Sequence, residues 1–186
     1  MKHNNVRNKM RRGSISLILG PMFSGKTSEL FRRLRREKIA KKQTLLIKYA
    51  HDNRYSEDQA STHDLFKMDC VGALFLKDID IPEGINVIGI DEGQFFPDIL
   101  HFVEYWTSEL GIDVIVCGLD GNYKREPFGH LLDLVPKCTK LDKLCAVCSY
   151  CGAEAPFTKR TVVSDDEVLI GGSDKYVASC ITCYFK

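Results

Sequence analysis

Residues 15–27 constrain this chain more than any other stretch. An apolar run ends at Gly20, and after four intervening residues the chain continues with Gly25-Lys26-Thr27. This is the G-x-x-x-x-G-K-[ST] spacing of a phosphate-binding loop (P-loop), in its usual setting between a buried strand and a helix. A glycine-rich turn that binds nothing is the alternative, and the agreement of the loop with its flanks disfavours it.

Each residue type in this loop has a physical role. Gly20 and Gly25 permit backbone angles that turn successive N–H groups inward around an anion. The N-terminus of the following helix adds positive potential, Lys26 can reach the outer phosphates, and the Thr27 hydroxyl can hold Mg²⁺. We therefore predict that the chain binds a nucleoside triphosphate. The predicted phosphate-binding residues are Gly20, Pro21, Met22, Phe23, Ser24, Gly25, Lys26 and Thr27.

Apolar strand patterns alternate with helical patterns along the first three quarters of the chain. Besides the strand before Gly20, we expect strands at residues 44–49, 86–91 and 113–117, and helices at residues 27–42 and 100–110. Strands that are apolar through most of their length favour a parallel sheet covered on both faces. Ligands bind at the carboxyl edge of such a sheet.

Charge and composition limit the possible partners. The formal net charge is +1, so the chain as a whole has no electrostatic attraction to nucleic acid or a membrane. No apolar run approaches the length of a membrane-spanning helix. The predicted helix at 27–42 has a basic face, which is either a patch for phosphate or nucleic acid or, as the near-neutral charge favours, an ordinary solvated face. Residues 1–13 are polar and basic, and we expect a disordered tail rather than a transit peptide.

The chain has 8 cysteines, and most of them follow residue 144. Without a secretion signal, disulfides are disfavoured and paired Cys-x-x-Cys spacings indicate metal. Four thiolates suit a closed tetrahedral Zn²⁺ site, which is structural, whereas buried free thiols are the alternative. The predicted zinc ligands are Cys148, Cys151, Cys180 and Cys183. Cys145 shares the spacing and is interpreted as a core residue or a spare ligand.

Two adjacent acids, Asp91 and Glu92, end the predicted strand at 86–91. An acid at a strand end beside a P-loop holds Mg²⁺, so Thr27 and Asp91 are the predicted Mg²⁺ ligands. Because adjacent strand residues point to opposite sides, Glu92 is interpreted as a base that takes a proton from an attacking oxygen rather than as a second metal ligand. The candidate cations on adjacent loops, each otherwise a plain surface charge, are Arg54, Lys124 and Arg125.

A series of motifs carries a resemblance to a known family. They are GPMFSGKT at 20–27, DNRY at 52–55, THD at 62–64, DEGQFFPD at 91–98, LDG at 119–121, TKR at 158–160, IGG at 170–172 and Cys-x-x-Cys at 180–183. In this order and combination, the chain resembles the cytosolic zinc-containing (type II) thymidine kinases from about residue 15 to its last residue. The combination is far more specific than any single motif.

The resemblance implies a phosphotransferase that uses ATP and Mg²⁺ to phosphorylate the 5′-hydroxyl of thymidine, and of deoxyuridine as well, in pyrimidine deoxynucleotide salvage. By position, Glu92 would be the base on that hydroxyl, with Arg54 and Lys26 as further catalytic residues. The loop between the zinc pairs would fold over the thymine as a lasso. The implied substrate-binding residues are Met22, Asp52, Arg54, Glu92, Phe95, Leu119, Tyr123, Thr158, Leu169, Ile170, Gly171 and Tyr176. Such kinases are typically cytoplasmic homotetramers inhibited by thymidine triphosphate.

Two places depart from the pattern of that family. Asn122-Tyr123 stands where Thr-Phe usually follows Leu-Asp-Gly, so the aromatic contact carries an extra hydroxyl. Glu167 stands where an apolar lasso residue is common. Neither change removes a predicted catalytic group, and both bear on the shape of the nucleoside pocket.

The combined prediction is an α/β protein with a P-loop (RecA-like) parallel sheet flanked by helices, plus a small zinc-binding β domain with a lasso loop. We expect a tail at 1–13, an ATP-binding domain at 14–143 and a zinc-binding domain covering the nucleoside at 144–186. The expected partners are thymidine and ATP, with no nucleic acid and no membrane. Two other functions are open: a P-loop ATPase whose zinc module binds nucleic acid, and a nucleotide-binding module without catalysis. Small size and near-zero charge disfavour the first, and Glu92 beside Asp91 disfavours the second.

Overall fold

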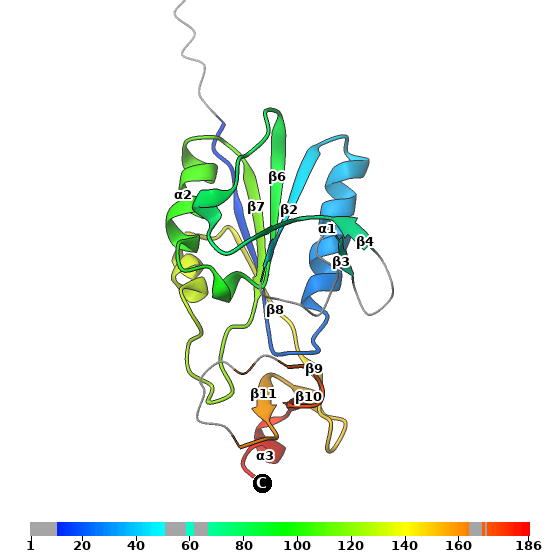
Figure 1. The fold of residues 1–186 in the computed structure, drawn as a ribbon. Coiled ribbons are helices and arrows are strands. Elements are labelled where there is room, and N and C mark those ends of the chain that lie inside the picture. The colour runs from blue at the N-terminus through cyan, green and yellow to red at the C-terminus, as the bar shows by residue number, and fades with distance from the viewer. Residues whose placement is uncertain (1–10, 51–58, 62–66, 164–168, 170) are drawn as a thin grey trace, which may run out of the picture.

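A six-stranded parallel sheet forms the larger part of the structure (Figure 1). The computed structural model describes residues 11–50, 59–61, 67–163, 169 and 171–186. The strand order is β5-β2-β6-β7-β1-β8, and every pair of neighbours is parallel. These strands are β1 (Ile15–Leu19), β2 (Gln43–Tyr49), β5 (Val71–Ala73), β6 (Ile85–Asp91), β7 (Asp113–Gly118) and β8 (Lys140–Lys143). The predicted parallel α/β sheet is therefore confirmed.

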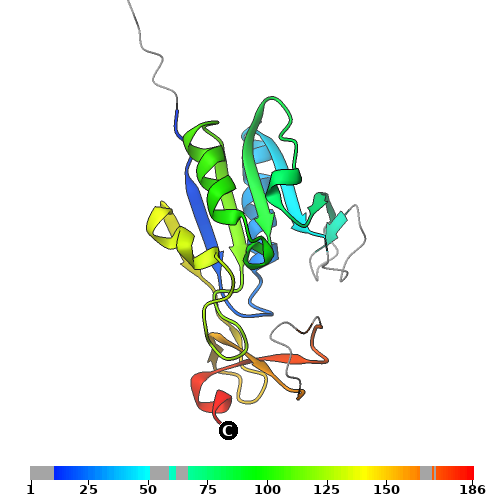
Figure 2. The ribbon, with the colours of Figure 1, turned by 60° about the vertical axis from the view of Figure 1, so that its left-hand side comes forward.

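Helices cover both faces of this sheet (Figures 1 and 2). Helix α1 (Lys26–Ile39) packs on one face, and α2 (Ile99–Ser108) with the 3₁₀ helix η3 (Leu131–Lys137) packs on the other. Leu17 and Ile18 of β1 are both fully buried but belong to the cores on opposite faces. Burial on both faces explains why the strands are apolar through most of their length.

Helix α1 packs against the sheet through the apolar face that the sequence predicts. Leu30, Phe31 and Leu34 are buried there. Gly89 of β6 permits this close approach, because a Cβ atom at that position would lie 2.6 Å from Cδ1 of Leu34. The helix is therefore fixed to the sheet directly behind the P-loop.

Both predicted helices end earlier than expected. The helix predicted at 27–42 ends at Ile39, because Lys41 adopts a left-handed φ of 61° and its N–H group bonds to the carbonyl of Lys38 at 2.9 Å. The helix predicted at 100–110 ends at Ser108, and Gly111 follows with a φ of 67°. A left-handed residue after the last turn is a common way for a helix to end.

The basic face of α1 is engaged by carboxylates. Glu29 accepts from Arg32 at 2.6 Å and from Arg33 at 2.8 Å, and Arg33 also donates to Asp142 at 2.7 Å. The hydrogen bond from Arg32 contributes most to lowering the pKa of Glu29 to about 2, with Arg33 adding to it. In these pairs, carboxylates occupy Arg32 and Arg33, which agrees with the interpretation of this face as an ordinary solvated surface rather than a nucleic-acid patch.

A smaller lobe lies beyond the carboxyl edge of the sheet (Figures 1 and 2). It contains two antiparallel strand pairs and a short helix. These elements are β9 (Ala146–Val147), β10 (Glu154–Ala155), β11 (Phe157–Arg160), β12 (Tyr176–Ser179) and α3 (Ile181–Tyr184). The predicted zinc-binding β domain thus also contains a short helix, α3, which the Cys180 sulfur caps by accepting from the N–H group of Cys183.

The remaining elements are short connections. They are β3 (Gln59–Ser61), β4 (Lys67–Asp69), η1 (Leu76–Asp78) and η2 (Gly93–Phe95). Residues 1–10 of the predicted tail lie outside the described residues. Of those that follow, Arg11 pairs with Asp113 at the start of β7 at 2.6 Å, and the Gly13 N–H group bonds to the Thr107 carbonyl in α2 at 2.8 Å. Within the described ranges, no helix has the length and apolarity needed to cross a bilayer.

Two variants of α1 test how the sheet is held. Leu34→Ala should lower the free energy of unfolding by about 2–5 kcal/mol, because it leaves a cavity between the helix and Gly89. Ile39→Ala is the matched control on the same helix, since Ile39 is 79% exposed and should change stability by no more than about 0.5 kcal/mol. Urea unfolding measures both, and equal losses in the two variants would contradict this packing.

Candidate functional site

The P-loop forms a tight turn between β1 and α1. Gly20, Phe23 and Gly25 have positive φ angles of 149°, 66° and 81°. A Cβ atom at Gly20 would lie 2.5 Å from the carbonyl oxygen of Leu144, so both the angle and the space require glycine there. The loop ends at Gly25, which precedes the first residue of α1. The N-terminal end of this helix therefore faces the loop.

The Lys26 side chain is folded into this loop. Its ammonium donates to the carbonyl of Pro21 at 2.7 Å, and the side chain is buried. The Ser24 hydroxyl donates to the same carbonyl at 2.9 Å. A buried ammonium beside the N-terminal end of α1 gives the loop a positive potential, which suits a phosphate group.

Asp91 and Thr27 meet at the carboxyl edge of the sheet. The Thr27 hydroxyl donates to Oδ1 and Oδ2 of Asp91 at 3.1 and 3.2 Å, and Asp91 is only 4% exposed. Hydroxyl and carboxylate oxygens are the hard ligands that Mg²⁺ prefers. These two predicted Mg²⁺ ligands therefore fit the ion, and they lie next to the P-loop.

The Asp91 carboxylate has two further donors. The buried Cys117 thiol of β7 donates to Oδ1 at 2.8 Å, and the N–H group of Glu92 donates to the same oxygen at 3.1 Å. Burial, followed by the charge of Asp91, raises the pKa of Cys117 well above its usual range, so this thiol keeps its proton. The sequence patterns assign no role to Cys117, which they show only as part of an apolar run.

Glu92 lies at a bend directly after β6. Its φ is 54°, a left-handed angle that is rare outside glycine, and β6 ends at the residue before it. The separation of Glu92 from Asp91 therefore comes from this bend and not from the alternation of strand residues. Its Oε2 atom accepts a hydrogen bond from Nε2 of Gln94 at 2.7 Å.

Gln94 connects Glu92 to the loop after β7. Its Oε1 atom accepts from the N–H group of Leu119 at 2.9 Å, and the side chain is 3% exposed. The sequence patterns assign no role to Gln94, although its position two residues after Glu92 was the available signal. The contact brings Leu119, a predicted nucleoside-binding residue, to the predicted base.

Aromatic rings gather at the same edge of the sheet. Phe95 stacks on Tyr49 with ring centroids 5.0 Å apart and meets Phe128 edge to face at 5.4 Å. The Phe95 ring thus lies between Tyr49, at the end of β2, and Phe128, in the loop after β7. Such a rigid aromatic surface suits the flat ring of a nucleobase.

The smaller lobe contributes side chains to this site. Thr158 of β11 is buried, and its hydroxyl oxygen accepts from the N–H group of Met22 in the P-loop at 2.9 Å. Tyr176 of β12 donates to the Leu169 carbonyl at 2.8 Å. Arg160, to which the sequence patterns assign no role, donates to the Tyr176 hydroxyl at 3.0 Å.

Tyr123 joins this group through Arg160, whose guanidinium lies 3.6 Å from the centroid of the Tyr123 ring. The structure thus brings Tyr123 and Tyr176 together around one cation. Gly171 lies in the segment that leads into β12 and is half-buried. The predicted substrate residues Asp52, Arg54 and Ile170, and the departure at Glu167, lie outside the described residues.

The loop after β7 is stabilised by the residue that departs from the family pattern. Asn122 is buried, and its Oδ1 atom accepts from the N–H groups of Lys124 and Glu126 at 2.9 and 3.0 Å.

The Arg125 guanidinium lies over aromatic rings of the smaller lobe, at 4.9 Å from Tyr184 and 4.6 Å from Phe185. Arg125 therefore holds the loop to that lobe, and this position does not support a role at the phosphates.

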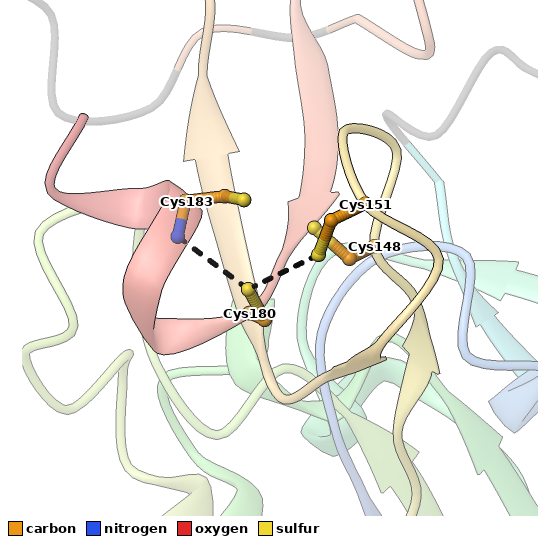
Figure 3. Close-up of side chains that lie close together, drawn as sticks. All are labelled: Cys148, Cys151, Cys180 and Cys183. Atoms are coloured by element: carbon orange, nitrogen blue, oxygen red, sulfur yellow. Dashed lines mark hydrogen bonds between the residues drawn. The ribbon is translucent and has the colours of Figure 1, made fainter.

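The four paired cysteines converge on one point in the smaller lobe (Figure 3). Their sulfur atoms all lie within 4.8 Å of one another, and the sulfurs of Cys151 and Cys180 are 3.6 Å apart. A zinc ion with Zn–S bonds of about 2.3 Å requires sulfur separations of about 3.8 Å. The cluster therefore fits zinc. Cys145 is exposed and outside the cluster, so its interpretation as a core residue was wrong.

The cysteines come from both ends of the lobe. Cys148 and Cys151 follow β9, whereas Cys180 and Cys183 follow β12. Hydrogen bonds from backbone N–H groups, led by that of Cys180, lower the pKa of Cys148 to about 6, whereas burial and the neighbouring cysteines raise the pKa of Cys183 to about 12. Because zinc binds thiolates, its binding would displace the protons that the cluster holds. The other members of this core cluster are alanines, and Tyr176 is also buried in the lobe, so its apolar core is small.

Comparison with known proteins decides the family. A family model described as thymidine kinase matches residues 13–184. The chain belongs to the thymidine kinase family. It is 51% identical over 176 residues to proteins named "Thymidine kinase, cytosolic" from Cricetulus griseus and Homo sapiens, covering 94% of this chain and 74% of each relative. It is 47% identical over 176 residues to the thymidine kinase of Variola virus, covering 94% of this chain and 98% of that protein.

Membership of the thymidine kinase family agrees with the resemblance that the motifs carry. The match spans the sheet, the P-loop and the cysteine cluster, so it does not rest on one motif.

Metal analysis tests the cysteine cluster. The purified chain should contain about one zinc ion, because four thiolates complete a tetrahedral shell. Cys180→Ser should lose most of this zinc and unfold at a lower temperature, whereas Cys145→Ser should keep both its zinc and its melting temperature. Full zinc content in Cys180→Ser, or its loss in Cys145→Ser, would contradict the assignment.

Proposed function

We propose that this chain transfers the terminal phosphate of ATP to the 5′-hydroxyl of thymidine, and of deoxyuridine as well, in pyrimidine deoxynucleotide salvage. One observation carries the proposal: Glu92 lies between the two halves of the site. Its N–H group bonds to Asp91 beside the P-loop, and its carboxylate bonds to Gln94, which holds Leu119 of the predicted nucleoside pocket. A base in this place faces both the phosphate and the hydroxyl that attacks it.

The mechanism follows from the groups of this chain. N–H groups at the Gly25 end of the P-loop and in the first turn of α1 bind the phosphates, and Lys26 stabilises the negative charge that the phosphates carry. Thr27 and Asp91 would hold Mg²⁺, which neutralises charge on the phosphate oxygens. Glu92 accepts the proton of the 5′-hydroxyl while the 5′-oxygen forms a bond to the terminal phosphorus of ATP. The bond from this phosphorus to ADP breaks, and ADP leaves. Most of the rate enhancement comes from holding these groups in line.

The proposed nucleoside pocket lies between the sheet edge and the smaller lobe. Support comes from the aromatic stack of Phe95 and from the contact of Thr158 with the P-loop. The described residues of the proposed pocket are Met22, Glu92, Phe95, Leu119, Tyr123, Thr158, Leu169, Gly171 and Tyr176. We include Asp52, Arg54 and Ile170 from the resemblance alone, with Arg54 as a further catalytic residue.

The remaining features of the proposal rest on family membership. Zinc would be structural, holding together the two ends of the loop that covers the nucleoside. We further propose a cytoplasmic homotetramer that thymidine triphosphate inhibits. The names of the mammalian relatives, which include the word cytosolic, support the location. A nucleic-acid-dependent ATPase gains no support, because Arg32 and Arg33 of the basic helix are paired with carboxylates.

ADP release tests the proposed function. It is measured with thymidine, with single-stranded DNA, and with neither. Thymidine-dependent release of ADP is the expected result. Release that depends on DNA alone would contradict the kinase and support the ATPase.

The variant Glu92→Gln tests the base. It should lower the turnover of thymidine by about 10²-fold or more, because the hydroxyl proton then has no acceptor. ATP binding, measured by calorimetry, should stay close to that of the wild type, since the P-loop is unchanged. Wild-type turnover in this variant would remove Glu92 from the mechanism.

A further inference from the structure

The Gln94 side-chain amide connects Glu92 to the loop after β7 through two hydrogen bonds of fixed direction. The N–H group of Leu119 can only donate, so it fixes Oε1 of Gln94 as its acceptor at 2.9 Å. The opposite end of the amide must then be the NH₂ group, which donates to Oε2 of Glu92 at 2.7 Å. The amide cannot be turned over without losing both bonds.

Glycines surround this bridge closely. A Cβ atom at Gly118 would lie 2.4 Å from Oε1 of Gln94, and one at Gly129 would lie 2.1 Å from its backbone oxygen. Gly129 also has a left-handed φ of 59°. The end of β7 therefore lies close against the Gln94 amide, and the loop after β7 lies close against the Gln94 backbone.

Glu92 itself needs such support. Its left-handed φ of 54° places the carboxylate at a sharp bend, with Gln94 two residues further along the chain in η2. A base must lie within about 3 Å of the proton that it accepts, so small rotations of its side chain matter. The bond from Gln94 restrains this rotation from the side of the nucleoside loop.

We infer that Gln94 is a positioning residue, which aligns Glu92 with the nucleoside loop through its two hydrogen bonds. The inference rests on the proposed function. It adds a link between nucleoside binding at Leu119 and proton acceptance by Glu92. When Leu119 seats the nucleoside, the same amide sets the carboxylate against the 5′-hydroxyl. Gln94 touches neither substrate in this account, and it acts through Glu92.

Two substitutions of Gln94 separate its two bonds. Gln94→Glu keeps an acceptor for the Leu119 N–H group but replaces the neutral amide donor to Glu92 with a second carboxyl group, which competes with Glu92 for a proton. Gln94→Met has a similar length and loses both. Thr107→Val is the control. Thr107 is buried like Gln94, and this variant removes a hydroxyl group that donates to the Val103 carbonyl. Thr107 lies in α2, away from the site.

Steady-state kinetics with thymidine and ATP is the main measurement. Both Gln94 variants should lower kcat by about tenfold or more, since a small misplacement of the base is costly, while KM for ATP changes by no more than about twofold. Gln94→Met should in addition raise KM for thymidine, because only this variant frees Leu119. Thr107→Val should lose stability and keep its kcat.

A second readout does not depend on turnover. The amide resonance of Leu119, observed in protein labelled with ¹⁵N-leucine, should shift in Gln94→Met and move much less in Gln94→Glu. A value of kcat within about twofold of wild type in both Gln94 variants would overturn the inference, as would equal losses in kcat and in affinity for ATP. Failure of both variants to fold would assign Gln94 a structural role and overturn it as well.

The wild type separates this inference from the proposed function. An active wild type with unimpaired Gln94 variants overturns the inference alone. A wild type that releases no ADP with thymidine overturns the proposed function and this inference with it.

Discussion

The site depends on one buried carboxylate. Asp91 accepts hydrogen bonds from the Thr27 hydroxyl at the start of α1, from the Cys117 thiol of β7 and from the N–H group of Glu92. A carboxylate that is almost fully buried is stable as an anion only when donors surround it. These donors join the helix behind the P-loop, the central strand and the segment that carries the proposed base. The distance from phosphate to base is therefore built into the fold of the sheet.

The smaller lobe is attached to the same site by few but specific contacts. Thr158 bonds to the backbone of Met22, although 136 residues separate them in the sequence. Arg125 packs on Tyr184 and Phe185 and joins the loop after β7 to the end of the chain. Because the apolar core of the lobe is small, the cysteine cluster supplies much of its stability in our account. In our proposal, zinc would act on catalysis indirectly, by holding in place the lobe that forms one wall of the proposed nucleoside pocket.

Much of the fold and of the P-loop site could be predicted from local patterns. Apolar strands and helical periodicity indicate the parallel sheet, because burial on both faces leaves a clear signature. The spacing around Lys26 and the paired cysteines are equally local, and the structure brings those cysteines together. Thr27 and Asp91 are distant in sequence, but both follow from the general architecture of P-loop proteins.

The remaining features could not be predicted, because they depend on contacts that have no local pattern. Strand β8 is polar and lies at the edge of the sheet, so it lacks the apolar run of a buried strand. Cys117 looks like any apolar strand residue until the fold places it against Asp91. Gln94 has meaning only once Leu119 is beside it. The left-handed angle at Glu92 was also hidden, since a non-glycine residue rarely adopts it.

A crystal structure with thymidine, Mg²⁺ and a non-hydrolysable ATP analogue would test the central claim most directly. The account predicts that the 5′-oxygen of the nucleoside lies within about 3.2 Å of the Glu92 carboxylate and in line with the terminal phosphate. A 5′-oxygen that lies far from this carboxylate, with the analogue seated in the P-loop, would contradict it.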